Sequence, residues 1–152
     1  MKANYTDALF LLAQIETNEG NKAEAIKHVE RAATLNPNDA TIFFRLGLLR
    51  YDSSLYTDSV GAFEQAVMID NTYWNARYFL GLAYQKVGRS SDALIQFNIL
   101  KQVLPENEDV KNAHALNEHR NIVINWCRGD LLKSFNVIYS VLNYKDASFD
   151  LD

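Results

Sequence analysis

The sequence lacks the residues and runs that mark several classes of protein. It contains one cysteine, Cys127, so a disulfide within the chain is impossible and the composition fits a reducing compartment. Its longest apolar runs, such as residues 8–13, are far too short to cross a bilayer. Residues 1–5 lack the apolar core of a signal peptide. We therefore expect a cytoplasmic chain that does not insert into a membrane.

The chain also has no excess of positive charge. Its net charge is −4, and its acidic and basic residues are interspersed without a stripe of lysine or arginine. A nucleic-acid partner is therefore not expected, because such partners bind basic patches. With 48% hydrophobic and 22% charged residues, the chain has the composition of a folded domain with a core.

Residue patterns for chemistry are missing as well. The sequence has no glycine-rich phosphate loop and no serine-centred nucleophile elbow. His114 and His119 are five residues apart, which is not the spacing of four that aims two imidazoles at one metal ion, and we interpret them as part of a solvated helix face. We expect no catalytic residues, no cofactor and no metal site. An enzyme of unfamiliar type is the least favoured hypothesis.

What the sequence does contain is one pattern that repeats every 34 residues without an insertion. The aligned columns are Leu12, Leu46 and Leu80; Ala13, Gly47 and Gly81; Ala25, Ser59 and Ala93; Val29, Phe63 and Phe97; and Pro37, Asn71 and Pro105. Glycine inside a helix costs about 0.5–1 kcal/mol, so the small residues predict places where two helices pack closely. We interpret the small and aromatic columns as core.

Each copy contains two helical stretches separated by a breaker. The breakers are residues 20–21, 52–54 and 88–91, and the middle one has no glycine. Pro37 and Pro105 end the second helices of the outer copies. The middle copy has Asp70, Asn71 and Thr72 instead, where we expect side-chain-to-backbone hydrogen bonds to form the turn.

These columns resemble the tetratricopeptide repeat (TPR) family, and the third copy carries them best with Leu80, Gly81, Tyr84, Ala93 and Phe97. The resemblance implies an all-α, right-handed superhelical solenoid of helix-turn-helix repeats over residues 6–39, 40–73 and 74–107. It also implies a non-enzymatic scaffold that binds a protein or peptide. The sequence of residues 76–84 resembles bacterial TPR segments attached to larger envelope proteins. A soluble domain of such a protein is therefore the alternative to a free cytoplasmic chain.

In this family the first helix of each pair lines a concave groove, and the register identifies the lining residues. Most of them are apolar or aromatic, so we predict a largely apolar groove surface. Its residues are Phe10, Gln14, Phe44, Leu48, Tyr51, Tyr78 and Leu82. The positions that match the family's carboxylate clamp for chaperone tails hold only one cation; they are Phe10, Gln14, Arg45, Asn75 and Phe79. A chaperone-tail receptor is therefore disfavoured. The aromatic residues are equally consistent with packing against neighbouring helices or under the chain's own tail.

The register fails after Asn107, and we predict capping helices with a short tail over residues 108–152. An imperfect apolar face is expected to seal the third copy; its members are Val110, Ala113, Leu116, Val123, Ile124 and Cys127. A second helix is expected from Asp130 to about Tyr144, with apolar residues Leu131, Phe135, Ile138 and Leu142. Residues 137–139 are also compatible with a strand. The alternative function is self-assembly, with this apolar C-terminal segment forming a homo-oligomer.

Overall fold

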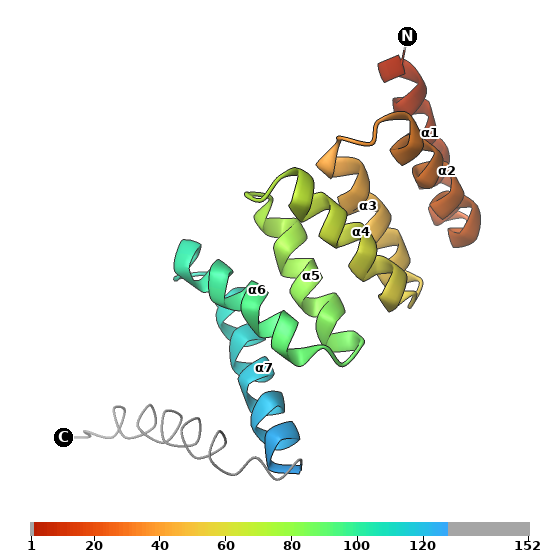
Figure 1. Ribbon diagram of the computed structural model, residues 1–152. Helices are drawn as coiled ribbons and strands as arrows, with labels where there is room; N and C mark the ends of the chain where they lie inside the picture. The colour runs from red at the N-terminus through yellow and green to blue at the C-terminus, as the bar shows by residue number, and fades with distance from the viewer. Residues whose placement is uncertain (1, 128–152) are drawn as a thin grey trace, which may run out of the picture.

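The computed structural model describes residues 2–127, and this part of the chain consists of α-helices joined by short turns, without a strand (Figure 1). The helices are α1 (Lys2–Asn18), α2 (Lys22–Leu35), α3 (Ala40–Asp52), α4 (Tyr56–Ile69), α5 (Trp74–Lys86), α6 (Ser90–Val103) and α7 (Glu108–Cys127). Three pairs form, α1 with α2, α3 with α4 and α5 with α6, and the second helix of each pair packs against the next helix along the chain. The predicted all-α solenoid of helix pairs is confirmed.

The turn inside each pair has the same geometry at positions 34 residues apart. Gly20, Ser54 and Gly88 have φ angles of +86°, +63° and +80°. The next residue closes each turn with a backbone N–H bond five residues back, for example Asn21 to Glu16 at 2.7 Å. This is the left-handed helix end that glycine favours. The middle pair makes it with a serine.

Polar side chains form the turns between pairs. The Asp70 carboxylate accepts hydrogen bonds from the backbone N–H and the hydroxyl of Thr72 at 2.9 and 2.7 Å. The side-chain-to-backbone bonding predicted for the turn without proline is therefore confirmed. Asp39 accepts from the Thr41 N–H at 2.9 Å and so caps α3.

The core lies between the helices of each pair, where the small residues and the phenylalanines of the repeat columns meet. A Cβ atom added to Gly47 would stand 2.5 Å from the Phe63 ring, and one added to Gly81 would stand 2.6 Å from the Phe97 ring. Both phenylalanines are fully buried. The interpretation of these columns as core is confirmed, and the close contact explains why a helix keeps a residue of low helix propensity.

Helix α7 packs against α6 at the end of the solenoid opposite α1 (Figure 1), as the sequence predicts. Its buried side chains include Val110 and Ala113, but Leu116 is 65% exposed and does not belong to the sealing face. Asn117 is buried there instead, and its Nδ2 donates a 2.7 Å hydrogen bond to the Ser90 carbonyl.

His114 corrects the expectation of a solvated face. Its side chain is only 6% exposed, with Nε2 2.7 Å from Asn98 Oδ1 and Nδ1 3.7 Å from a Glu118 oxygen. Burial lowers the pKa of the His114 imidazole, against the opposing effect of Glu118. The helix predicted from Asp130 and its apolar residues lie outside the described residues.

Candidate functional site

The residues predicted to line a groove lie on the three first helices. Phe10 and Gln14 are on α1, and the others occupy α3 and α5: Phe44, Leu48, Tyr51, Tyr78 and Leu82. Gln14 is exposed, and the other six side chains are half-buried. We call the surface that these seven residues form the inner face.

Between α3 and α5 the inner face is filled by aromatic rings around Phe79. The centroid of the Phe79 ring lies 5.8 Å from that of Phe44, 6.4 Å from Tyr51 and 5.7 Å from Tyr78. Phe79 also stacks on the buried Phe63 at 5.9 Å. The half-buried rings therefore belong both to the surface and to the packing that joins two helix pairs.

Phe79 was missing from the predicted lining residues. Its column in the repeat holds Leu11 and Arg45, so aromatic character does not recur there. A signal was nevertheless present, because Phe79 follows Tyr78 on the same helix and is one of the positions that the sequence analysis matched to the carboxylate clamp. A residue type shared by a whole column does not mark Phe79, because its role depends on contacts with Phe44 and Tyr51 of the neighbouring pair.

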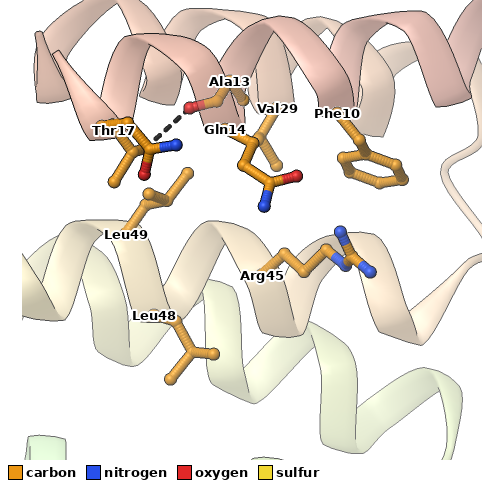
Figure 2. A pocket seen from close by; sticks show the side chains of 9 residues that line it. Phe10, Ala13, Gln14, Thr17, Val29, Arg45, Leu48 and Leu49 are labelled. Carbon is orange, nitrogen blue, oxygen red and sulfur yellow. Dashed lines mark hydrogen bonds between the residues drawn. The ribbon is translucent and has the colours of Figure 1, made fainter.

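Between α1 and α3 the inner face is open. A pocket of about 390 Å³ lies here, and Figure 2 shows its lining: Phe10, Ala13, Gln14, Thr17, Asn18, Val29, Arg45, Leu48 and Leu49. The side chain of Arg45 extends along the gap from α3 toward Phe10 of α1 (Figure 2), with its guanidinium carbon 4.6 Å from the ring centroid. The pocket thus combines an apolar floor with the polar groups of Gln14, Thr17 and Arg45.

A smaller pocket of about 110 Å³ lies beside Tyr78, among α5, α6, α7 and the turn before α7. Its lining consists of Trp74, Asn75, Tyr78, Leu100, Leu104, Asn107, Asp109 and Val110. Tyr78 therefore lies between the ring cluster and this pocket.

The phenols of the inner face stay protonated over the physiological range. Burial raises the pKa of Tyr51 and of Tyr78 above the ordinary tyrosine value, and nearby acidic or phenolic groups raise both further. Each hydroxyl therefore presents a neutral donor and acceptor to a ligand.

Within the described part of the chain, residues 2–127 with side chains from 5 to 118, no cluster of three histidine, cysteine or carboxylate side chains is placed to hold a metal ion. None of the helices described there combines the length and hydropathy needed to span a bilayer.

Comparison with known proteins places the chain among helical repeats. A family model described as "Tetratricopeptide repeat" matches residues 6–49. Anaphase-promoting complex subunit 3 of Schizosaccharomyces pombe (strain 972) is 27% identical over 97 residues, which cover 64% of this chain but only 15% of that protein. This relative is a yeast protein, and the bacterial origin stays a prediction.

Solved structures share the fold at low sequence identity. The second TPR domain of human RPAP3, in complex with the HSP70 peptide SGPTIEEVD, has a TM-score of 0.71 at 16% identity, covering 78% of this chain and 98% of that one. MamA has a TM-score of 0.71 at 19% identity, covering 95% and 82% of the two chains.

Proposed function

We propose that the inner face of this chain, a member of the tetratricopeptide repeat family, binds an extended or helical segment of another protein. In this proposal the chain acts as a non-enzymatic scaffold. Residues 1–107, with the three repeats from 6 to 107, form the binding domain in this proposal, and residues 108–152 cap it. The observation that carries the proposal is the half-buried apolar and aromatic surface that runs across α3 and α5 and ends in the open pocket beside α1.

Two arguments support this role. Aromatic side chains held by their neighbours lose little conformational freedom on binding, and such residues dominate the affinity of protein interfaces. In addition, the structurally similar TPR domain of human RPAP3 is in complex with a peptide. Leu48 and Leu82 add aliphatic surface one turn along from Phe44 and Tyr78, so a ligand meets a continuous apolar strip.

The ring contacts decide how this proposal is tested. Replacing Phe44 and Tyr78 by alanine removes contacts with Phe63, Phe79 and Phe97, so such a variant is expected to lose stability as well as binding. The double change Leu48→Glu and Leu82→Glu places carboxylates on the strip and keeps the rings. Both leucines are half-buried and pack against the core, so the stability of this variant is measured beside its binding. Its matched control is Met68→Glu with Ile95→Glu, on α4 and α6, where the side chains are 71% and 53% exposed.

The assay is selection of short random peptides displayed on phage against the immobilised chain, with thermal unfolding of every variant. We expect the unaltered chain and the Met68/Ile95 variant to enrich the same peptides, and the Leu48/Leu82 variant to lose them while it remains folded. Equal enrichment by both variants would remove the inner face as the binding site. Absence of enriched peptides on the unaltered chain would remove the proposed function.

A second candidate function is self-association, and the exposed face of α1 favours it. Leu11, Leu12 and Ile15 are 61%, 44% and 48% exposed, which leaves an apolar stripe at the open end of the solenoid. The residue equivalent to Leu12 in α3 is Leu46, which is buried against α2. Sedimentation at several concentrations, with and without residues 130–152, tests whether the apolar C-terminal segment covers such a surface. A monomer in both samples contradicts this candidate.

A further inference from the structure

The two junctions between first helices are built from equivalent positions but end differently. At the junction of α3 with α5, Phe44 meets Phe79, and Tyr51 closes the space beside them. At the junction of α1 with α3, the residues 34 positions earlier are Phe10, Arg45 and Thr17. The ring-to-ring contact is thus replaced by a contact of a guanidinium with a ring, at 4.6 Å.

The pocket follows from these substitutions. Threonine is much smaller than tyrosine, and the Thr17 hydroxyl is turned back onto the Ala13 carbonyl at 2.7 Å. The arginine reaches the Phe10 ring without filling the space that Phe79 fills in the second junction. The pocket of about 390 Å³ therefore stands where the other junction has aromatic packing.

Arg45 is the charged group of this pocket. Its guanidinium lies against the Phe10 ring and acts electrostatically on the Tyr73 phenol, and among the side chains of residues 5–118 no carboxylate forms an ion pair with it. By contrast Arg50, one turn further along α3, pairs with Glu30 at 2.7 Å. Contact with the ring holds a guanidinium by its face, and the N–H groups at its edge remain able to donate to a planar acceptor.

From this geometry we infer that the pocket between α1 and α3 binds an acidic side chain, aspartate or glutamate, within the protein segment that occupies the inner face. The carboxylate accepts from the Arg45 guanidinium beside Phe10, and an adjacent apolar side chain of the same segment covers Leu48, Leu49 and Val29. The inference rests on the proposed function and adds the chemistry of the ligand.

Other anions fit less well. A phosphate or nucleic-acid backbone needs several cations, whereas the lining contains one and the chain carries a net charge of −4. A C-terminal carboxylate is the other source of the same chemistry. An acidic side chain within the segment is favoured because the segment then continues past the pocket along Phe44, Tyr51 and Tyr78.

The test uses the full chain and the peptides enriched by phage display. Arg45→Gln removes the charge and keeps a polar side chain of similar length. Arg31→Gln is the matched control, since Arg31 also lies over an aromatic ring, that of Tyr5 at 5.5 Å, but outside the pocket. Each recovered peptide is synthesised with a free and with an amidated C-terminus, and with its acidic residue changed to the corresponding amide.

We expect an acidic residue beside an apolar one in the enriched peptides. Loss of either charge, by Arg45→Gln or by the amide peptide, should weaken binding roughly tenfold or more, and the two losses should not add. Arg31→Gln and amidation of the C-terminus should leave affinity unchanged.

Three outcomes would overturn the inference while leaving the proposed function intact. In the first, the enriched peptides contain no shared acidic residue. In the second, Arg45→Gln and Arg31→Gln weaken binding equally, which indicates general electrostatic attraction between the chain and the peptide. In the third, amidation alone abolishes binding, which identifies the terminal carboxylate of the peptide as the bound group. Failure to enrich any peptide on the unaltered chain contradicts the inference and the proposed function together.

Discussion

The first helix pair, α1 with α2, and the third, α5 with α6, follow the same path but are packed with different residues. The third pair places Phe97 over Gly81, whereas the first uses the smaller Val29 with Ala13. In the third pair Leu80 is 3% exposed because α4 covers it; its equivalent Leu12 is 44% exposed. The comparison teaches that the repeat register sets the path of the chain. How much each residue stabilises the fold depends on the sizes of the side chains that meet and on whether a neighbouring helix covers them.

The largest effect is expected where the two pairs differ most in burial. Leu80→Ala should lower the free energy of unfolding by about 2–5 kcal/mol, because it opens a cavity between α4 and α5. Leu12→Ala should cost roughly 1 kcal/mol, since much of the side chain already contacts solvent. Denaturant unfolding of both variants measures the difference. Equal losses that depend on protein concentration would show that the α1 face is covered by another copy in solution.

The next effect concerns the glycine of the third pair. Gly81→Ala should lower the free energy of unfolding by about 1–3 kcal/mol, because the new Cβ would stand 2.6 Å from the Phe97 ring. Gly61→Ala is the matched control: Gly61 lies in α4, and a Cβ there meets no atom within 4 Å. That change should stabilise the chain by about 0.5–1 kcal/mol through helix propensity. Destabilisation by both would mean that helix geometry, not the ring, requires glycine.

The success of the sequence prediction is uneven for a physical reason. The helix pairs, their turns and the core columns were predictable because every copy places a small residue opposite an apolar one: Gly47 with Phe63, Gly81 with Phe97, and Ala13 with Val29. The pocket beside Arg45 was not predictable, because it depends on what differs between copies; the sequence marked Arg45 only as the one cation among the clamp positions.

The same limit explains the errors in α7. His114 and Asn117 are buried polar residues whose partners lie on α6: Asn98 for His114 and the Ser90 carbonyl for Asn117. A pattern of apolar residues cannot reveal such pairs, since their burial depends on hydrogen bonds across helices.

A third prediction converts the first pair to the packing of the third. Val29→Phe alone should destabilise the chain by about 1–3 kcal/mol, because in the third pair a Cβ on Gly81 would stand 2.6 Å from the Phe97 ring, and the first pair carries such a Cβ in Ala13. Adding Ala13→Gly should restore part of that loss, with a favourable coupling of about 1–2 kcal/mol. A double-mutant cycle in denaturant measures the coupling. Strict additivity would show that the two helices of the first pair approach differently from those of the third.

The smallest effect separates the pairs by pH. Burial is the main cause that raises the pKa of Tyr84 to about 12, with the hydrogen bond to Glu64 as the next, and that bond is 2.6 Å long. The equivalent residue of the first pair is Glu16, which carries no phenol. In the unfolded chain a tyrosine ionises near pH 10, as the ordinary tyrosine pKa of about 10 indicates.

Between these two pH values the unfolded chain loses the Tyr84 proton while the folded chain keeps it, so the contribution of Tyr84 to stability is complete below about pH 10 and is lost as the pH rises to about 12. Tyr84→Phe should cost about 1 kcal/mol at neutral pH, because Glu64 is partly exposed and exchanges its partner for water. The variant should also lose stability less steeply above pH 10 than the unaltered chain, although burial raises the pKa of Tyr51, Tyr73 and Tyr78 too. Unfolding curves at neutral and alkaline pH, with phenolate absorbance, measure both effects. An unchanged alkaline slope would assign the loss to those other phenols and would leave the third pair no more sensitive to pH than the first.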